Sequence, residues 1–365
     1  MQGVAVLGST GSIGVTTLAV LARHRDRFRL AAVTAGANAG LLAEQIAAWQ
    51  PAFAALASDA GPGCLVEAAI RPDVDIVVNA VVGFAGLEAT LAALKAGKRV
   101  ALANKESLVV AGDLVRLAAR EGGGELVPVD SEHSAVLQCL SGRSTPMRRL
   151  ILTASGGPFR DWPAERVLSA SVPDALKHPT WRMGSKITVD SATLANKALE
   201  VIEAHHLYGL DFGRIDVVVH PQSIIHAFVE FCDGSVLSQL GFPSMELPIL
   251  YALTHPERVS DTGIPSFDPV RAGALTFEPI RREVFRAFGL GVGAGETGGT
   301  APAVFNAANE VAVDAFLAGR IPFGRIPEII EATLADHAPE PVVDLTVVQS
   351  ADAWARRQAM MEAAA

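Results

Sequence analysis

Cysteine is scarce in this sequence, and its scarcity excludes two kinds of stabilised fold. The 365 residues include only Cys64, Cys139 and Cys232, which lie too far apart for a thiolate zinc cluster or a disulfide framework. We therefore expect three reduced thiols, most of them buried, as is usual in a reducing compartment.

Long apolar runs are absent as well. No run approaches the roughly 20 residues that a membrane-spanning helix needs. The apolar residues Val4–Leu7 are too few for the core of a signal peptide, and the glycine-rich segment 8–14 follows them directly. We therefore expect a protein that stays in the cytoplasm and has no membrane partner.

The sequence has no excess of positive charge. Its 30 lysine and arginine residues are outnumbered by 39 aspartate and glutamate residues, which gives a net charge of −9. Nucleic acids and anionic membranes bind basic surfaces, so we expect neither as a partner. An anionic substrate would have to be held by donors gathered within a site. Half of the residues are hydrophobic, which indicates a folded protein, and the length predicts two or three domains.

In residues 1–148, short apolar runs alternate with segments of helical periodicity. This alternation predicts a doubly wound α/β domain with a parallel sheet. The predicted strands are Gly3–Leu7, Leu30–Thr34, Ala52–Leu56, Ile76–Asn79, Val100–Leu102 and Glu125–Val129. The predicted helices are Ile13–Arg23, Leu41–Trp49, Gly63–Ile70, Leu87–Ala96 and Glu106–Arg120.

The pattern changes in residues 149–285, where few strands and helices alternate. A mixed sheet with helices on one face is expected there. Residues 286–300 are rich in glycine and predict a flexible linker, and residues 301–365 predict a small helical domain. The predicted strands are Leu150–Ala154, Val217–Val219, Ala227–Phe231 and Val236–Leu240, and the predicted helices are Ser191–His206, Ala301–Leu317, Pro327–Asp336 and one in the last fifteen residues.

The first predicted strand leads into a glycine-rich turn, GSTGSIG at residues 8–14, which opens a helix. In this context glycines let the backbone approach the pyrophosphate of a dinucleotide at the helix N-terminus, although a plain tight turn has the same composition. The second strand ends in Gly36, Ala37 and Asn38, without the acidic residue that binds the ribose of NAD. The pattern therefore favours NADP, although no basic residue is present there to bind its 2′-phosphate.

Two polar segments follow later strands. Asp130 and Glu132 flank Ser131 at a strand end, and in an extended chain they would point the same way, which favours a divalent metal; capping of the next helix is the alternative. Lys105 follows Asn104 at another strand end, where ligands bind in such sheets, although a helix cap with a solvated lysine would look the same.

A phosphate site is predicted by two further segments. Asn196, Lys197 and Glu200 would share one helical face and suit a phosphate beside a metal, unless that face is simply solvated. Ser155 in a Ser-Gly-Gly turn offers donors to an anion, although a turn without a ligand is an equal alternative. A loop at 177–187 carries Trp181 and is expected to act as a lid. The more economical interpretation of His220, near a strand, is structural.

Together these segments resemble the 1-deoxy-D-xylulose-5-phosphate reductoisomerase family. The resemblance rests on GSTGSIG, LANKES, PVDSEH, SGGPF, HPTWRMGSKITVDSATLANKALEVIEA, HPQSIIHAFVEFCDGSVLSQLG and NAANEVAVDAFL, in that order over nearly the whole chain. It implies a Rossmann-like NADPH-binding domain at 1–148, a central α+β catalytic domain at 149–285, a C-terminal helical domain and a homodimer. It also implies rearrangement of a ketose phosphate, then reduction of the aldehyde by NADPH to 2-C-methyl-D-erythritol 4-phosphate, in the non-mevalonate isoprenoid precursor pathway.

The resemblance assigns roles to individual residues. The implied metal ligands, for Mg²⁺, Mn²⁺ or Co²⁺, are Asp130, Glu132 and Glu200, and Lys105 and Glu132 are the implied catalytic residues. The implied substrate-binding residues are Ser131, Ser155, His178, Trp181, Ser191, Asn196, Lys197 and Glu200. The implied cofactor-binding residues are Gly8, Ser9, Thr10, Gly11, Ser12, Ile13, Gly36, Asn38, Asn104, Lys105, Glu106, Met183 and Gly184.

Ala37 departs from relatives that have a basic residue here, so the 2′-phosphate would depend on Ser9, Asn38 and backbone donors, with weaker selectivity against NADH. Two other functions fit parts of the sequence. A plain NADPH oxidoreductase, such as a semialdehyde or homoserine dehydrogenase, shares the first domain but does not need the three acidic residues. A non-catalytic NADPH-binding redox sensor would need neither the metal residues nor the phosphate residues.

Overall fold

The computed structural model describes residues 1–143 and 145–364. These residues form two compact units. The first unit comprises Met1–Ser107, Leu114–Arg143 and Ser244–Ser266, and the second comprises residues 108–113, 145–243 and 267–364. Among the described residues, no helix is both long and apolar enough to cross a membrane.

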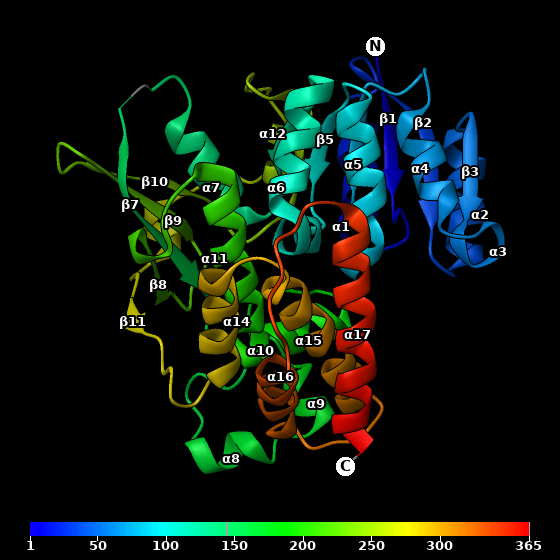
Figure 1. The fold of residues 1–365 in the computed structure, drawn as a ribbon. Helices are drawn as coiled ribbons and strands as arrows, with labels where there is room; N and C mark the ends of the chain where they lie inside the picture. The colour runs from blue at the N-terminus through cyan, green and yellow to red at the C-terminus, as the bar shows by residue number, and fades with distance from the viewer. Residues whose placement is uncertain (144, 365) are drawn as a thin grey trace. The chain divides into compact units, whose positions relative to one another are not determined.

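The first unit is built on a parallel sheet of six strands in the order β3-β2-β1-β4-β5-β6 (Figure 1). The sheet extends both ways from β1, which confirms the predicted doubly wound α/β fold. All six predicted strands are present, with ends shifted by at most two residues. They are β1 Gln2–Leu7, β2 Phe28–Ala35, β3 Phe53–Leu56, β4 Ile76–Asn79, β5 Arg99–Leu102 and β6 Glu125–Pro128.

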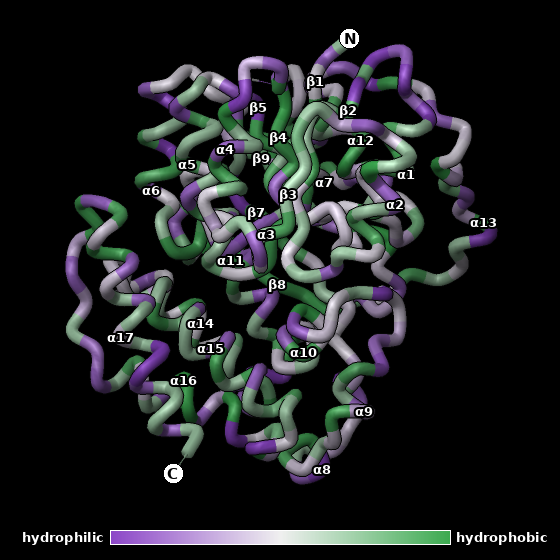
Figure 2. Tube along the Cα trace, turned by 90° about the vertical axis from the view of Figure 1, so that its right-hand side faces the viewer, coloured by the Kyte–Doolittle hydropathy of each residue, from purple (hydrophilic) through white to green (hydrophobic). Residues whose placement is uncertain are grey.

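Helices follow the strands of the first unit, as the alternating pattern predicts. Strand β4 is buried along its whole length, and it is coloured hydrophobic in Figure 2. The helices are α1 Ser12–Arg23, α2 Ala39–Trp49, α3 Ala57–Ala60, α4 Gly63–Ile70, α5 Leu87–Lys95, α6 Lys105–Gly122 and α7 Ser131–Leu140, with a short 3-10 turn, η1, at Gly83–Gly86.

One helix of the first unit comes from far along the sequence. Helix α12, Glu246–Thr254, contacts α1 and α7, and its Ile249, Leu250 and Leu253 pack into the same core as Val4 of β1. The segment 244–266 therefore belongs with the parallel sheet of the first unit, although the sequence pattern grouped it with residues 149–285. The apolar residues of this segment do not show, from the sequence alone, which of the two sheets they pack against.

The second unit contains a five-stranded sheet in the order β10-β9-β7-β8-β11. Strands β7 and β8 are parallel, whereas the other pairs are antiparallel, so the sheet is mixed, as predicted. Its strands are β7 Met147–Ala154, β8 Ile215–Val219, β9 Ile225–Phe231, β10 Val236–Leu240 and β11 Glu278–Pro279.

The single helix predicted at Ser191–His206 is wrong, because the structure contains two. Helix α10 spans Ser185–Thr193 and α11 spans Ala195–Tyr208, with Leu194 between them at a φ of 60°. A leucine in the left-handed region is strained by about 1 kcal/mol. Leu194 is only 3% exposed, so burial of its side chain compensates for that strain.

The predicted flexible linker is also wrong, because Arg286–Thr297 forms helix α14. A Cβ atom on Gly291 would lie 2.6 Å from Cβ of Ala198, and one on Gly295 would lie 2.7 Å from the ring of Phe212. These two glycines therefore let α14 pack closely against its neighbours. The predicted helical C-terminal part is confirmed by helices α15 Ala301–Leu317, α16 Arg325–Ala335 and α17 Leu345–Ala364. The other helices of the unit are α8 Ala164–Leu168, α9 Val172–Ala175 and α13 Pro269–Ala272, with a 3-10 turn, η2, at Phe212–Arg214.

Candidate functional site

The turn between β1 and α1 is shaped by two glycines. Gly8 has a φ of 78°, and a Cβ there would lie 2.7 Å from the carbonyl oxygen of Ala80. A Cβ on Gly14 would lie 2.4 Å from the carbonyl oxygen of Gly8. Gly11 is less constrained, because its nearest contact would be at 3.4 Å. The turn is therefore packed too tightly for side chains at two of its three glycines, which fits the dinucleotide-binding interpretation better than a plain turn does.

Only some backbone N–H groups of this turn have an acceptor within the fold, and that of Gly11 donates to the carbonyl oxygen of Gly8 at 3.0 Å. Those of Gly8 and Ser9 donate to the carbonyl oxygen of Thr34 on β2, at 3.0 and 2.8 Å. Within the described residues, those of Thr10, Ser12 and Ile13 have no acceptor. Donors at the start of a helix that the fold leaves unsatisfied attract an anion such as a pyrophosphate.

The side chains expected at the 2′-phosphate have other partners. Ser9 is fully buried, and its Oγ donates to Oε1 of Gln45 at 2.6 Å. Asn38 caps α2 by accepting from the N–H of Leu41 at 3.1 Å. Gly36 and Ala37 are exposed. The described segment therefore offers the 2′-phosphate no charged side-chain donor of its own.

Lys105 is buried at the start of α6, and its Nζ lies 2.5 Å from Oδ2 of Asp130. The solvated-lysine alternative is therefore wrong. Asn104 is buried beside it and donates to the carbonyl oxygens of Val81 and Gly83, both at 2.8 Å, which fixes the loop after β4. Asn104 also donates to Glu106 at 3.1 Å. A paired cation and carboxylate thus lie at the strand-end edge of the first unit.

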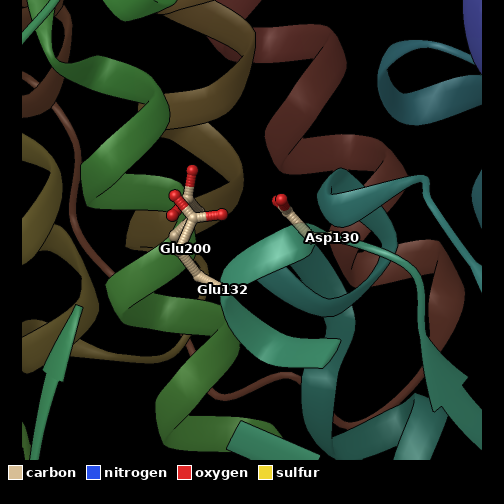
Figure 3. Close-up of side chains that lie close together, drawn as sticks. All are labelled: Asp130, Glu132 and Glu200. Atoms are coloured by element: carbon tan, nitrogen blue, oxygen red, sulfur yellow. The ribbon is translucent and has the colours of Figure 1, made fainter. Parts of the chain in front are cut away.

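The carboxylates of Asp130 and Glu132 lie near each other in space, but not for the predicted reason. Strand β6 ends at Pro128 and α7 begins at Ser131, so Glu132 lies in the first turn of a helix rather than in an extended chain (Figure 3). The strand-alternation argument is therefore wrong. The capping alternative is wrong for Asp130, because its side chain makes no cap hydrogen bond. Ser131 donates its hydroxyl to Glu132.

In the second unit, Lys197 and Glu200 form a buried ion pair on α11, the helix that carries Glu200 in Figure 3. Lys197 is 4% exposed and also donates to the carbonyl oxygen of Thr153 at 2.5 Å, whereas Glu200 is 1% exposed. Asn196 donates to the other oxygen of Glu200, also at 2.5 Å. The solvated-face alternative is therefore wrong for Lys197 and Glu200, and the three side chains gather as their helical spacing predicts.

Ser155 and His178 lie together, with Oγ and Nε2 separated by 2.9 Å. The other ring nitrogen, Nδ1, accepts from the backbone N–H groups of Thr180 and Trp181, at 3.1 and 2.8 Å. Nδ1 therefore carries no proton, and Nε2 donates to Ser155. Burial lowers the pKa of His178 from 6.5 to about 4, so the imidazole is neutral at neutral pH.

The predicted lid, residues 177–187, is a loop only as far as Gly184, because Ser185 begins α10. Trp181 and Met183 are half-buried, and the ring of Trp181 lies 6.3 Å from that of His226. Ser191 is half-buried on α10. The structural interpretation of His220 is confirmed, because its Nδ1 lies 2.8 Å from the carbonyl oxygen of Thr276 and its Nε2 accepts from the N–H of Ile224.

Two buried polar residues in these regions were not predicted. Asp190 is 1% exposed, lies 2.9 Å from Nζ of Lys186 and accepts from Asn309 of α15 at 2.7 Å. The four-residue spacing of Lys186 and Asp190 was the available signal. Gln45 on α2 was missed as well, although it falls three residues after the buried Leu42, on the same face of the helix.

Comparison with known proteins agrees with these features. The model for 1-deoxy-D-xylulose 5-phosphate reductoisomerase matches residues 4–69 and 58–112, and models for C-terminal domains of that enzyme match residues 126–208 and 240–358. The 1-deoxy-D-xylulose 5-phosphate reductoisomerase of Heliobacterium modesticaldum is 50% identical over 98% of this chain and 96% of its own length, and that of Gloeobacter violaceus is 48% identical over the same shares.

Solved structures also match this chain over nearly its whole length. A DOX-P reductoisomerase in complex with NADPH, fosmidomycin and magnesium has a TM-score of 0.93 and 38% identity, with 100% of this chain and 98% of that one covered. The 1-deoxy-D-xylulose 5-phosphate reductoisomerase of Zymomonas mobilis in complex with NADPH has a TM-score of 0.88 and 42% identity, over 99% and 98% of the two chains. The chain therefore belongs to the 1-deoxy-D-xylulose 5-phosphate reductoisomerase family.

Proposed function

We propose that this protein converts 1-deoxy-D-xylulose 5-phosphate and NADPH to 2-C-methyl-D-erythritol 4-phosphate, in the cytoplasm, as a step of the non-mevalonate isoprenoid precursor pathway. The observation that carries the proposal is the match along 98% of the chain to relatives of that name. The buried pairs of Lys105 with Asp130 and of Lys197 with Glu200 support it, because burying ionised groups is costly and such groups gather at functional sites.

Asp130, Glu132 and Glu200 are the proposed ligands of a divalent metal. Each offers one carboxylate oxygen, and those of Asp130 and Glu132, both in the first unit, lie within 4.8 Å of each other. A donor set made only of oxygen fits Mg²⁺, Mn²⁺ or Co²⁺. When bound, such a cation supplies a Lewis acid that polarises the substrate's carbonyl and hydroxyl oxygens.

The remaining polar residues are assigned to the substrate. Lys105 donates to the substrate oxygens that gain negative charge, and Glu132 moves a proton beside them. The phosphate group lies far from the reacting carbons, so its binding energy is available to orient them and to close the lid over them. The phosphate is assigned to Ser155, His178, Ser191, Asn196 and Lys197, the oxygen chain to Ser131, and the covering lid to Trp181.

NADPH is assigned to the glycine-rich turn and the segments beside it. The tight approach of backbone at Gly8 and Gly14 and the unsatisfied N–H groups of Thr10, Ser12 and Ile13 support this. Hydride transfer is chemistry of the cofactor itself. The further residues assigned to NADPH are Gly11, Gly36, Asn38, Asn104, Lys105, Glu106, Met183 and Gly184. The family resemblance also supports a homodimer, which sedimentation of the purified protein would test.

The decisive experiment follows NADPH oxidation with and without the sugar phosphate and with and without Mg²⁺. Turnover is expected only when both are present, whereas a plain dehydrogenase would not need the metal. Glu200→Gln removes one proposed metal charge while keeping the shape of the side chain, so metal-dependent turnover should fall by a factor on the order of 1,000. NADPH binding should be unchanged, and full activity in this variant would refute the ligand assignment.

A further inference from the structure

The side chain of Gln45 links helix α2 to the glycine-rich turn. It is 6% exposed. Its Oε1 accepts from Oγ of Ser9 at 2.6 Å, and its Nε2 donates to the backbone oxygen of the same serine at 2.9 Å. Both ends of one buried amide are therefore used on a single residue of the turn.

As a result, every polar group of Ser9 makes a hydrogen bond within the first unit. Its N–H donates to Thr34 of β2, its hydroxyl donates to Gln45, and its carbonyl oxygen accepts from Gln45. Ser9 is also fully buried. It has no hydrogen left to donate to a bound anion, whereas the next N–H groups along the chain, from Thr10, Ser12 and Ile13, have no acceptor within the described residues.

We propose that Gln45 is a positioning residue for the cofactor pyrophosphate, and that it acts through Ser9. The amide holds Ser9 against β2 and α2, so that the following N–H groups converge before the cofactor binds. This proposal rests on the proposed NADPH site. It assigns Ser9 an anchoring role in place of contact with the 2′-phosphate.

The physical basis is the cost of unsatisfied buried groups. Without the amide, the carbonyl oxygen and hydroxyl of Ser9 would be buried without partners, so the turn would relax to reach water. Cofactor binding would then have to restore the ordered turn, and affinity would fall accordingly. NADPH and NADH both carry the pyrophosphate, so both should be weakened by the same factor.

The test measures the dissociation constants of NADPH and NADH by fluorescence titration of the full chain, without substrate or metal. Gln45→Met keeps the length of the side chain and removes both hydrogen bonds. Both constants are expected to rise about tenfold, which corresponds to about 1.4 kcal/mol, with their ratio unchanged. Glu44→Met introduces the same side chain at the exposed neighbouring position on α2 and should leave both constants unchanged.

A double-mutant cycle tests whether the effect passes through Ser9. Ser9→Ala should weaken both nucleotides about threefold, and Gln45→Met with Ser9→Ala should bind no more weakly than Gln45→Met alone. Should Gln45→Met fail to fold, Ser9→Ala, which removes only the hydroxyl bond, makes the same prediction of an unchanged NADPH to NADH ratio.

Three results would overturn the proposal in distinguishable ways. If Ser9→Ala weakened NADPH but not NADH, the hydroxyl would be a 2′-phosphate ligand. If Gln45→Met folded and bound both nucleotides normally, Gln45 would have no positioning role. If the unaltered chain bound neither nucleotide, the proposed NADPH site itself would be wrong.

Discussion

The glycine-rich turn of the first unit and helix α11 of the second unit are suited to anions in opposite ways. The turn has no charged side chain between Gly8 and Gly14, and it offers backbone N–H groups. Helix α11 offers Lys197, a buried cation held by Glu200 and by the carbonyl oxygen of Thr153. Backbone donors need only space, whereas a buried charge needs its partner. Anion binding by the turn should therefore be weakened by larger side chains, whereas anion binding by α11 should be weakened by loss of a charged side chain.

The largest effect is expected from removing a charge on α11. Lys197→Ala takes away a proposed phosphate donor and breaks the buried ion pair with Glu200. We expect kcat/KM for the sugar phosphate to fall by a factor on the order of 100, mostly through KM, and stability to fall by about 3 kcal/mol. Steady-state kinetics and thermal unfolding measure the two effects, and the KM for NADPH should change little.

Lys95→Ala is the matched control on the surface. Lys95 is the exposed last residue of α5, and an exposed lysine contributes about 0–1 kcal/mol to stability. This variant should behave as the unaltered chain does. Equal increases in the KM of substrate and of NADPH for Lys197→Ala would contradict a phosphate role and would remove the contrast between the two regions.

A smaller effect is expected from adding one methyl group to the turn. In Gly14→Ala the Cβ would lie 2.4 Å from the carbonyl oxygen of Gly8 and 2.5 Å from Cα of Ser9, so the backbone must move. NADPH affinity should fall by at least about tenfold, since the N–H groups no longer converge. In Gly11→Ala the nearest atom would be 3.4 Å away, and the loss should be below about threefold. Similar affinities in both variants would contradict the proposed tight approach.

Both regions could be located from the sequence, because each depends on neighbours in the chain. The turn is one continuous motif after a strand, and Asn196, Lys197 and Glu200 gather through helical spacing alone. The local geometry around them was less predictable. Asp130 and Glu132 were paired by strand alternation, although β6 ends at Pro128 and Glu132 is helical. The end of a short strand depends on sheet pairing, which the local pattern does not contain.

Long-range packing explains the other errors. The glycines of α14 predicted flexibility, but Gly291 and Gly295 provide space for neighbouring side chains. The break at Leu194 depends on burial of a leucine in a strained conformation. The hydrogen bonds between Gln45 and Ser9 join residues that are 36 positions apart in the sequence. A single sequence shows none of these contacts, because each depends on residues that are distant in the sequence and meet only in the folded chain.

The smallest expected effect concerns acid, to which the two regions should also respond differently. The turn contains no titratable side chain, whereas the second unit contains His178, whose pKa burial lowers to about 4. The unfolded chain takes up this proton near pH 6.5, but the folded chain does so only near pH 4. The folded state should therefore lose stability as the pH falls from 6.5 towards 4, by about 1 kcal/mol at pH 5.5. His178→Gln, which does not titrate, should lose less over this range in denaturant unfolding. Parallel losses in the two proteins would show that other groups account for the acid sensitivity and that burial does not hold the imidazole of His178 neutral.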